Sequence, residues 1–527
     1  MDTTQWLIFF FVIQVIHFLG TWKLYVKAGR KSWEAAVPIY NAVVLMQIIN
    51  RPKWWVILLF VPIVNLIMFP VVWVETLRSF GKNSTVDTII GILTLGLYIY
   101  YINYFIDHQY IENRSLKPKS ESGETVSSIL FAVVVATIIH NYVIQPYTIP
   151  TSSLEKTLLV GDFLFVSKVN YGPRIPQTTI ALPMVHDTIP LAKVKSYSKF
   201  PQLPYMRLPG FTKPKRNDIV VFNWPTDTVY QFFDYTSNRR AYKPMDKRSN
   251  YVKRTVGAPG DDLEIKNGVV YINNEILDLG DRAKIQYSYI VTTNGTPLDV
   301  NFIFKDLGVT EGVQQLKADT YYFSALTQES VNRLEQLSIV KEVKKHVSNG
   351  AEFHPVKNGF LAIFPHNKPW NGDNLGPIHI PAKGEVVSLN NETLPFYEAI
   401  IKDYEHNTLE VKDDGSIFIN GQQTTSYTIQ QDYYYMMGDN RHRSEDSRYW
   451  GFVPADHIVG KPVMIWLSLD ATVPWSKAFD KIRWKRLFTT VHGSGKPHSF
   501  FIYLVIALAA WAAYAFVKKR KGKKYDY

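Results

Sequence analysis

The sequence contains no cysteine. Disulfide bonds, thiolate metal ligands and cysteine nucleophiles are therefore excluded, although this absence does not identify a cellular compartment. Three catalytic signatures are also missing: a His-Glu-x-x-His metal motif, a Gly-x-Ser-x-Gly nucleophile elbow and a glycine-rich phosphate loop. We therefore expect no metal and no cofactor, and an ordinary hydrolase triad has little support.

The chain carries a large excess of positive charge, which is concentrated in particular segments. The formal net charge is +12, yet no RNA-recognition, zinc-binding or helix-turn-helix signature accompanies it, so we expect no nucleic-acid partner. Much of the excess lies beside apolar segments, as in Lys518–Lys521. Charge in such positions sets the orientation of membrane segments.

Five apolar runs are long enough to cross a bilayer core, which requires about 20 residues. The first run lacks the basic start and the small-residue exit of a cleaved signal peptide. The segment 35–50 is shorter and contains Pro38, so we expect it to be interfacial or re-entrant. His140 lies in the fourth run, where a bundle-facing or interfacial histidine is the simplest interpretation. The predicted spans are residues 4–22, 54–74, 88–106, 126–145 and 499–517.

Basic residues cluster beside these runs. Lysines and arginines crowd the stretch 23–53, and Arg114, Lys117 and Lys119 precede the fourth run. Because cytoplasmic loops are enriched in Lys and Arg, these clusters and the basic tail place the amino terminus outside and the carboxyl terminus in the cytoplasm. The predicted regions are then a three-span membrane region (1–125), the fourth span (126–145), an extracytoplasmic domain (146–498), the fifth span (499–517) and a cytoplasmic tail (518–527).

The extracytoplasmic segment is rich in short runs of β-branched and aromatic residues separated by Gly, Pro, Asn and Asp. Asn267-Gly268 predicts a two-residue hairpin turn. The segments 263–275 and 409–422 resemble each other, either as a repeated hairpin or through convergence on good hairpin chemistry. These patterns predict a mainly antiparallel β domain behind a multispan α-helical membrane anchor.

Two further parts of this segment differ from the β pattern. Residues 172–216 are proline-rich and basic, which predicts an extended connection over the surface. Residues 276–400 mix strand and helix signals, including a predicted helix near 326–346, and are typical of an α/β insertion. The sequence discloses no role for this insertion.

A hydroxyl cluster, Thr151-Ser152-Ser153, follows the fourth span within a few residues. A hydroxyl nucleophile needs a base, and a lysine can serve if burial lowers its pKa. Lys253 lies in the strand-like run 251–257, where alternation places Lys253 and Arg254 on opposite faces, so that one can point inward while the other stays solvated. A lysine in a strand is more often structural or exposed, so this position alone does not establish catalysis.

Four motifs follow one another in the predicted extracytoplasmic segment, at residues 149–162, 217–222, 251–261 and 438–454. The first begins with Ile-Pro-Thr-Ser-Ser-Leu, the third surrounds Lys253, and the fourth begins with Gly-Asp-Asn-Arg. In this order the motifs resemble the serine box, the next strand, the lysine box and the carboxyl-terminal box of bacterial type I signal peptidases, the last closely.

The resemblance implies a signal peptidase I-like β fold with a Ser/Lys dyad. Ser153 would be the nucleophile and neutral Lys253 the general base. The backbone amide of Ser153 and the Thr151 hydroxyl would form the oxyanion hole, where family members usually have serine in place of threonine. Ser444 would hydrogen-bond to and orient Lys253. Asp446 and Arg448 would support that loop as an ion pair.

The resemblance also implies a substrate and a location. Shallow apolar pockets would select small residues at the −1 and −3 positions of signal peptides of exported preproteins. The enzyme would lie in the bacterial cytoplasmic membrane and contact membrane lipid, with the secretion translocon as a further candidate partner. The residues that match pocket-lining positions are Ile149, Pro150, Leu154, Leu158 and Val252.

Some residues depart from the family pattern. Ser152 replaces the usual glycine, Leu154 replaces the usual methionine, and Glu155-Lys156 occupies a place where proline is common. The local turn beside the nucleophile is therefore expected to differ from that of other members.

Two alternatives remain. Ser153-x-x-Lys156 fits the Ser-x-x-Lys motif of penicillin-binding acyl transferases, but the Lys-Thr-Gly element and the helical domain that should accompany it do not appear. The chain could also be a catalytically silent membrane sensor or peptide-binding scaffold. Retention of both Ser153 and Lys253 argues against that interpretation.

Overall fold

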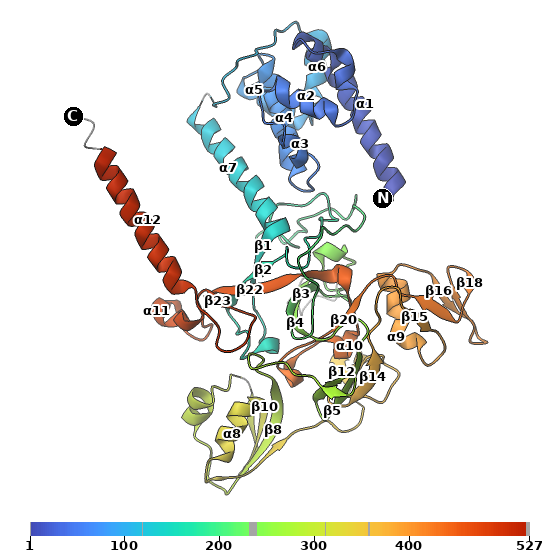
Figure 1. Cartoon of the computed structure of the whole chain (residues 1–527), viewed down its shortest axis with the longest axis vertical. Helices are drawn as coiled ribbons and strands as arrows, with labels where there is room; N and C mark the ends of the chain where they lie inside the picture. The colour runs from blue at the N-terminus through green and yellow to red at the C-terminus, as the bar shows by residue number, and fades with distance from the viewer. Residues whose placement is uncertain are drawn as a thin grey trace. The chain divides into compact units, whose positions relative to one another are not determined.

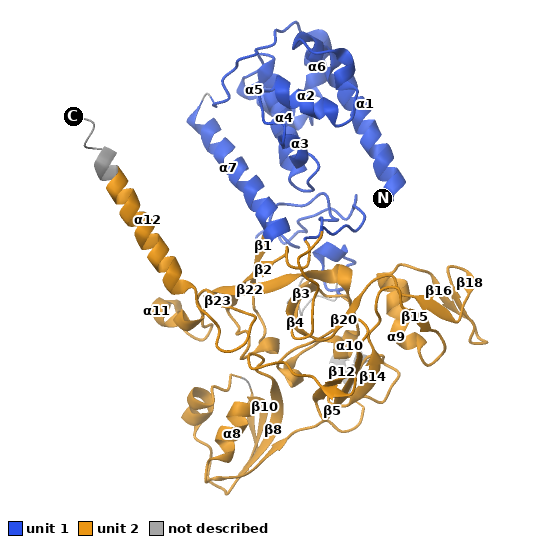
Figure 2. Ribbon diagram, in the orientation of Figure 1, with its two compact units in different colours: residues 1–143, 173–208, 227–248 blue, residues 144–172, 209–226, 249–527 orange. Residues whose placement is uncertain are grey.

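The computed structural model describes residues 2–118, 120–230, 240–310, 312–351, 353–356 and 359–522. Lys119 and the last five residues of the basic tail, which contributed to the predicted topology, lie outside these ranges. The chain divides into two compact units (Figure 2). Unit 1 comprises Met1–Val143, Pro173–Leu208 and Asp227–Arg248, and unit 2 comprises Ile144–Gly172, Pro209–Thr226 and Ser249–Tyr527.

Unit 1 is built mainly from helices (Figure 1). The first helix starts at an N-cap, since the Asp2 carboxylate accepts a hydrogen bond from the Gln5 amide at 2.7 Å. Apolar side chains from several helices, including Leu24, Met46 and Ile102, form one buried core. The helices are α1 (Thr3–Lys27), α2 (Tyr40–Ile48), α3 (Trp55–Leu58), α4 (Asn65–Ser79), α5 (Thr85–Leu93), α6 (Tyr98–Phe105) and α7 (Glu121–Ile138).

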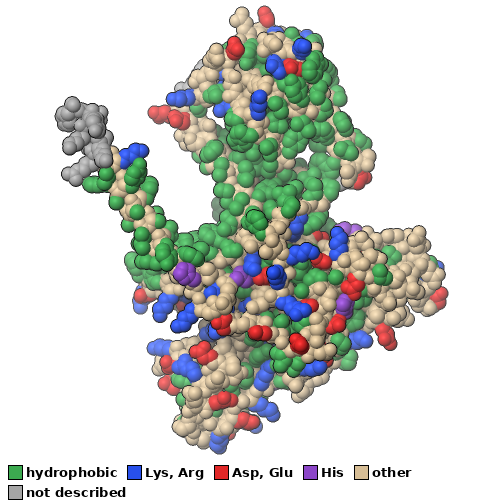
Figure 3. Space-filling model, viewed as in Figure 1, with side chains coloured by type: hydrophobic (Ala, Val, Ile, Leu, Met, Phe, Trp, Pro, Cys, Tyr) green, Lys and Arg blue, Asp and Glu red, His purple; other side chains and the backbone are tan. Residues whose placement is uncertain are grey.

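Three helices in the described part of the chain are individually long and apolar enough to cross a membrane. They are Thr3–Lys27, Glu121–Val143 and Phe501–Lys518, the last being most of α12 (Phe501–Gly522). These helices coincide with the predicted spans at 4–22, 126–145 and 499–517. Figure 3 shows apolar side chains along much of the helical part of unit 1 and along α12, with charged side chains at the top of unit 1 and scattered over unit 2.

The predicted span at 54–74 is not one continuous helix. The chain breaks between α3 and α4, where Pro62 lacks an amide hydrogen and Ile63 has a positive φ of 72°. The neighbouring segment 35–50 holds α2, whose nine residues extend about 14 Å at the rise of an α-helix. A helix of that length is too short to cross a bilayer.

The predicted span at 88–106 is likewise broken. Its two halves, α5 and α6, meet at an angle of 115°. Leu95 and Gly96 between them both have positive φ values, 50° and 84°, which a helix does not contain. This pair is either a broken span or a re-entrant loop.

The proline-rich segment forms an extended arm, in agreement with its composition. Residues 173–208 contain no helix or strand longer than an isolated bridge. The arm belongs to unit 1, where the indole of Trp6 donates a hydrogen bond to the Gln202 carbonyl at 2.8 Å. Its antiparallel bridges are Arg174 with Arg207, Thr178 with Gln202, Ala181 with Tyr197 and Thr188 with Lys195.

The centre of unit 2 is an eight-stranded antiparallel sheet with the order β1-β2-β22-β3-β4-β20-β21, in which β23 pairs with β22. Every residue of β3 and β20 is buried, so both faces of the sheet are covered there. The strands are β1 (Ile144–Thr148), β2 (Asp162–Ser167), β3 (Ile219–Asn223), β4 (Asn250–Gly257), β20 (Tyr433–Met437), β21 (Val453–Pro454), β22 (Ile458–Ser468) and β23 (Thr489–Thr490).

Smaller sheets surround this centre. One has the order β14-β5-β6-β7 and another β11-β8-β10-β9. The remaining strands pair as β12-β13, β15-β19 and β16-β17-β18. Their bounds are β5 (Asp262–Lys266), β6 (Val269–Ile272), β7 (Glu275–Ile276), β8 (Gln286–Thr293), β9 (Val313–Lys317), β10 (Thr320–Thr327), β11 (Val340–Lys345), β12 (Phe353–Val356), β13 (Gly359–Ala362), β14 (Leu375–His379), β15 (Val386–Ser388), β16 (Leu409–Val411), β17 (Ile417–Ile419), β18 (Gln422–Gln423) and β19 (Ser426–Thr428).

The predicted hairpin at Asn267-Gly268 is confirmed. Lys266 pairs with Val269, and the two turn residues have positive φ values of 49° and 78°, as a type I′ turn requires. The similar segment 409–422 forms the hairpins of β16, β17 and β18. The likeness of the two segments is therefore one of local structure as well as of sequence.

The predicted helix at 326–346 is wrong in extent. Only α8 (Gln328–Glu335) is helical, capped by the Thr327 hydroxyl, and the chain then forms β11. This strand lies at the edge of its sheet, and its charged residues Lys341, Glu342 and Lys344 are exposed, as is common for an edge strand. The other short helices of unit 2 are α9 (Leu394–Ala399), α10 (Ser447–Trp450) and α11 (Ala478–Lys481).

Candidate active site

Ser153 lies on a three-residue 3-10 turn, Ser152–Leu154, shortly after β1. Thr151 precedes the turn in extended conformation and is exposed, whereas Ser153 is only 8% exposed. Asn440 holds the turn by its backbone, because its amide donates to the Ser153 carbonyl at 3.1 Å and its side chain to the Ser152 carbonyl at 3.3 Å. The fourth motif therefore fixes the backbone on which Ser153 stands.

Lys253 lies in the middle of β4, opposite Val220 of β3. It is 3% exposed, and its Nζ donates a hydrogen bond to Ser153 Oγ at 2.6 Å. The two predicted dyad residues, which are distant in the sequence, are thus in direct contact. At this short distance, a neutral Lys253 amine is also placed to accept the proton of the Ser153 hydroxyl.

Burial lowers the pKa of Lys253 from 10.5 to about 8, although the nearby carboxylates of Asp446 and Glu445 act in the opposite direction. The cause is the loss of hydration of the charged ammonium group. At pH 7 a lysine with this pKa is neutral in about one molecule in ten, compared with fewer than one in a thousand for an ordinary lysine. Lys253 is therefore suited to act as a base near neutral pH.

Asp446 and Arg448 form the expected ion pair, and both are almost fully buried. The Arg448 guanidinium donates to both carboxylate oxygens, at 2.8 and 2.9 Å. Although burial alone would raise it, the pKa of Asp446 is held below its ordinary value by Arg448, and by the charge of Lys253. Asp446 also accepts from the Gly438 amide at 3.0 Å, so the pair ties the fourth motif to the end of β20.

The expected hydrogen bond between Ser444 and Lys253 is not formed in this structure. Ser444 Oγ is buried and has no hydrogen-bond partner in the described part of the chain. It lies close to Gly438, where an added Cβ would fall 2.3 Å from Ser444 Oγ and 2.5 Å from the Ser153 carbonyl oxygen. Glycine at position 438 is therefore what allows these two segments to approach.

A second ion pair lies beside the dyad and was not anticipated. Arg254 donates to both carboxylate oxygens of Asp439, at 2.7 and 2.6 Å, and both side chains are buried. The prediction that one of Lys253 and Arg254 stays solvated is therefore wrong, because the sheet is covered on both faces. The acidic residue of the Gly-Asp-Asn-Arg motif was the signal that could have indicated a partner for Arg254.

The residues predicted to line substrate pockets fall into two groups. Ile149, Leu154 and Leu158 are buried and belong to a core cluster beneath the serine turn. Pro150 is exposed and Val252 is half-buried at the edge of the same cluster. Only the last two present a surface that a substrate could contact without displacing core side chains.

Lys156 does not act on Ser153 as the Ser-x-x-Lys alternative requires. Its Nζ donates instead to the Gly308 carbonyl oxygen. No group of three or more His, Asp or Glu side chains among the described residues is arranged to hold a metal ion.

Two parts of the chain match known families. Residues 122–331 and 375–467, more than half of the chain, match the family described as signal peptidase, peptidase S26. Residues 33–113 match a family of unknown function, DUF5684.

The chain is also similar to curated bacterial enzymes. It is 26% identical to Signal peptidase I of Buchnera aphidicola over 403 residues, which cover 73% of this chain and 92% of the relative. It is 25% identical to Signal peptidase I of Haemophilus influenzae over 391 residues, 72% of this chain and 79% of the relative. For Signal peptidase I of Helicobacter pylori the values are 24% over 382 residues, 70% and 93%.

Proposed function

The chain belongs to the signal peptidase family, peptidase S26, and on that premise we propose that Ser153 is its nucleophile and Lys253 its general base. The protein is a membrane signal peptidase, a serine peptidase that removes signal peptides from preproteins. The observation that carries the assignment of the dyad is the 2.6 Å hydrogen bond between Lys253 Nζ and Ser153 Oγ. The buried setting of Lys253 supports the same assignment, because it favours the neutral amine.

In the first half of the reaction, Ser153 Oγ attacks the carbonyl carbon of the scissile bond while its proton passes to Lys253 Nζ. Negative charge develops on the carbonyl oxygen. The Ser153 amide and the Thr151 hydroxyl donate hydrogen bonds to that oxygen, which lowers the barrier. The exposed position of Thr151 at the start of the turn leaves its hydroxyl accessible to substrate.

In the second half, the Lys253 ammonium returns the proton to the leaving amine, and the carbon–nitrogen bond breaks. The signal peptide remains on Ser153 as an ester. Neutral Lys253 then removes a proton from water, whose oxygen attacks the ester. As the bond to Ser153 Oγ breaks, the Lys253 ammonium returns that proton to Oγ, which releases the signal peptide and restores the dyad. Asp446 and Arg448 keep the loop beside Lys253 in place through both halves.

Substrate selection follows from the surface beside the turn. We propose that Pro150 and Val252 contact the small side chains at −1 and −3. Ile149, Leu154 and Leu158 support that surface from the core below. Cleavage after small residues is consistent with a shallow site, because a larger side chain would have to displace buried leucines.

We also propose a multispan anchor with the amino terminus outside and the carboxyl terminus in the cytoplasm. The three long helices α1, α7 and α12 give this orientation by themselves, with the basic segments on the cytoplasmic side. The orientation is unchanged if 54–74 and 88–106 both cross or both re-enter, since they add an even number of crossings. The mixed α/β segment 276–400 is proposed as an insertion of the outer domain.

Lipid contact is proposed for an aromatic collar, defined as Trp475, Phe479 and Trp484. Trp475 and Phe479 are 71% and 79% exposed. Trp484 packs against Phe501, the first residue of α12, with ring centroids 6.2 Å apart. The collar therefore lies at the depth where α12 enters the bilayer, the level at which tryptophan is favoured. A contact with the secretion translocon stays a prediction.

The dyad is tested by cleavage of a preprotein with alanine at −1 and −3. We expect Ser153→Ala and Lys253→Ala each to lower kcat by at least about 10⁴-fold. The matched control is Ser152→Ala, since Ser152 is an adjacent serine with no assigned role, and it should keep nearly full activity. Full activity of either dyad variant, or loss only in Ser152→Ala, would show that the assignment is wrong.

The topology is testable because the chain has no cysteine of its own. A single cysteine at Lys317 should react with a membrane-impermeant maleimide in intact cells, whereas one at Lys31 should react only after the membrane is opened. The opposite labelling pattern would show that the orientation is the reverse of the one proposed.

Lipid contact by the aromatic collar is tested with a Trp475→Ser/Phe479→Ser double variant. This variant should cleave a membrane-embedded preprotein more slowly but a short soluble peptide at the normal rate. Equal loss on both substrates would count against lipid contact.

A further inference from the structure

The strands β8 to β11, the helix α8 and a short π-helix (Phe302–Asp306) belong to a distinct part of unit 2, which we name the α8 subdomain and define as residues 284–346. Its sheet has the order β11-β8-β10-β9, and α8 packs on it (Figure 1). Side chains such as Val291, Phe323 and Leu334 give the subdomain a buried core of its own. The reaction proposed above uses none of its residues.

The subdomain nevertheless contacts the chain immediately after the nucleophile. Lys156, three residues beyond Ser153, donates from Nζ to the Gly308 carbonyl oxygen. Lys156 has a positive φ of 68°, a conformation that non-glycine residues rarely adopt and that costs free energy. The bond to Gly308 is a contact that can offset this cost and hold the turn.

Glu155 contacts the same loop. Glu155 is only 4% exposed, and its carboxylate accepts a hydrogen bond from the Thr310 hydroxyl at 3.3 Å. Glu329, in the first turn of α8, places a further negative charge near Lys156. Glu155 and Lys156, the two residues that replace the proline common in the family, therefore both face the α8 subdomain.

Thr157 connects the turn to the ion pair beside the dyad. Its Oγ1 donates to Asp439 at 2.6 Å and accepts from the Lys284 amide at 3.1 Å. The Gln286 amide donates to the Asp439 carbonyl at 2.9 Å. Because Asp439 binds Arg254, the neighbour of Lys253, the first strand of the subdomain is linked to both halves of the dyad.

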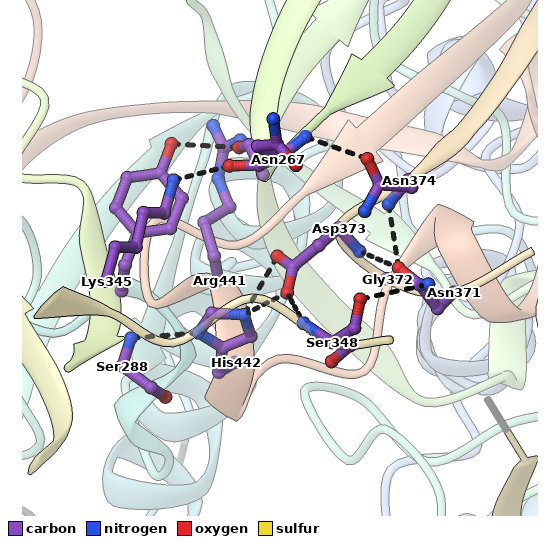
Figure 4. Close-up of polar contacts among 12 residues, drawn as sticks. Asn267, Ser288, Lys345, Ser348, Asn371, Gly372, Asp373, Asn374, Arg441 and His442 are labelled. Carbon is purple, nitrogen blue, oxygen red and sulfur yellow. Dashed lines mark hydrogen bonds and ion pairs between the residues drawn. The ribbon is translucent and has the colours of Figure 1, made fainter. Parts of the chain in front are cut away.

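His442 adds a second link between the subdomain and the fourth motif. Its Nδ1 accepts a hydrogen bond from the Ser288 amide at 2.9 Å, and Nε2 donates to the Asp373 carboxylate (Figure 4). Figure 4 shows the imidazole between these two partners, with Arg441 beside it in the sequence. Three chain segments thus meet at a residue only two positions before Ser444.

We propose that the α8 subdomain positions the serine turn for catalysis, and that Lys156 is the positioning residue through which it acts. The proposal rests on Ser153 being the nucleophile. Lys156 touches neither the substrate nor the reacting atoms; it sets the backbone that directs Ser153 Oγ towards Lys253. A shift of about 1 Å in a nucleophile can cost on the order of a hundredfold in rate, so such a contact can affect kcat strongly.

The test compares Lys156→Met, which keeps the aliphatic stem but removes the donor, with Lys156→Arg, which restores a donor. The matched control is Lys317→Met, an exposed lysine on β9 of the same subdomain. We expect Lys156→Met to lower kcat by about tenfold with KM nearly unchanged, since a tether, not a substrate contact, is lost. Lys156→Arg should recover most of the rate, and Lys317→Met should match wild type.

A second measurement does not depend on activity. In a Ser153→Ala background, Lys156→Met should increase hydrogen–deuterium exchange of the amides at 154–158 and 306–310, but not in the β5–β6 hairpin. Thr310→Val, a change at an exposed residue that removes the hydrogen bond to Glu155, should raise exchange at 154–158 to a smaller extent and keeps the test available if Lys156→Met folds poorly. Lys317→Met should leave exchange unchanged.

The outcomes separate the two proposals. If Ser153→Ala cleaves preprotein normally, the dyad assignment fails, whatever Lys156 does. If the dyad variants are inactive while Lys156→Met equals Lys317→Met in kcat and in exchange, the positioning role of the α8 subdomain is overturned. Loss of kcat in Lys156→Met with recovery in Lys156→Arg and with local exchange increased supports it.

Discussion

The two halves of the dyad are held in different ways. Lys253 lies on a central strand that pairs with β3 on one side and β20 on the other. Ser153 lies on an irregular turn, which depends on single contacts from Asn440, Thr157 and Lys156. The comparison teaches that sheet register places the proposed base, whereas contacts with segments distant in the sequence place the proposed nucleophile. The following variants probe this difference, in order of decreasing expected effect.

The largest effect is expected where the strand meets the fourth motif. Arg254→Met leaves the buried carboxylate of Asp439 without its cation, which should lower the free energy of unfolding by about 3–5 kcal/mol. The control is Lys402→Met, which breaks a pair with Glu398 whose side chains are 47% and 55% exposed and should cost at most about 0.5 kcal/mol. Thermal unfolding of both variants in detergent measures the difference. Equal losses would mean that the buried pair does not stabilise the strand.

The next effect concerns the turn itself. Thr151→Val removes the proposed oxyanion donor and should lower kcat by about a hundredfold, equivalent to about 2.7 kcal/mol, without changing thermal stability. Thr151→Ser keeps the hydroxyl and should retain most of the activity. Steady-state cleavage of the same preprotein by the three proteins measures both. Wild-type kcat in Thr151→Val would remove Thr151 from the mechanism.

A smaller effect is expected where the turn and the fourth motif approach most closely. Gly438→Ala places a Cβ within 2.5 Å of both Ser444 Oγ and the Ser153 carbonyl, an overpacking that should cost about 1–3 kcal/mol of stability. It should also lower kcat, because the Ser153 backbone must move. Gly312→Ala is the control, since its nearest contact would be 3.3 Å away. If both alanine variants unfold at the same temperature, the close approach is not critical.

The sequence predicted those features that depend on local pattern or on a family motif. The Asn267-Gly268 turn was correct because two positive φ values are an intrinsic preference of that pair. The long helices at the two ends of the chain and at 126–145 were visible because uninterrupted apolar runs suffice to indicate them. The motifs indicated Ser153 and Lys253, and the structure brings these residues into contact.

The features that could not be predicted from the sequence depend on the conformation of single residues or on contacts between distant parts of the chain. Ile63 and Leu95 interrupt the helices expected in two apolar runs, because both residues adopt a positive φ. Isoleucine and leucine side chains do not favour this conformation, so the sequence does not indicate it. Arg254 is buried because both faces of the sheet are covered, and the segments that cover them lie far away along the chain. The partner of Lys156 is a backbone carbonyl at Gly308, which has no sequence signature at all.

The central claim is that a desolvated, neutral Lys253 removes the proton from Ser153. Below its pKa the amine is protonated and cannot accept a proton, so activity must rise with pH. The most direct measurement is kcat/KM of the wild-type enzyme between pH 6 and 10.5, which reports the free enzyme. Because burial lowers the pKa of Lys253 to about 8, kcat/KM should rise tenfold per pH unit and level off near pH 8. A rise that continues to the 10.5 of an ordinary lysine, or a rate independent of pH, would contradict this account.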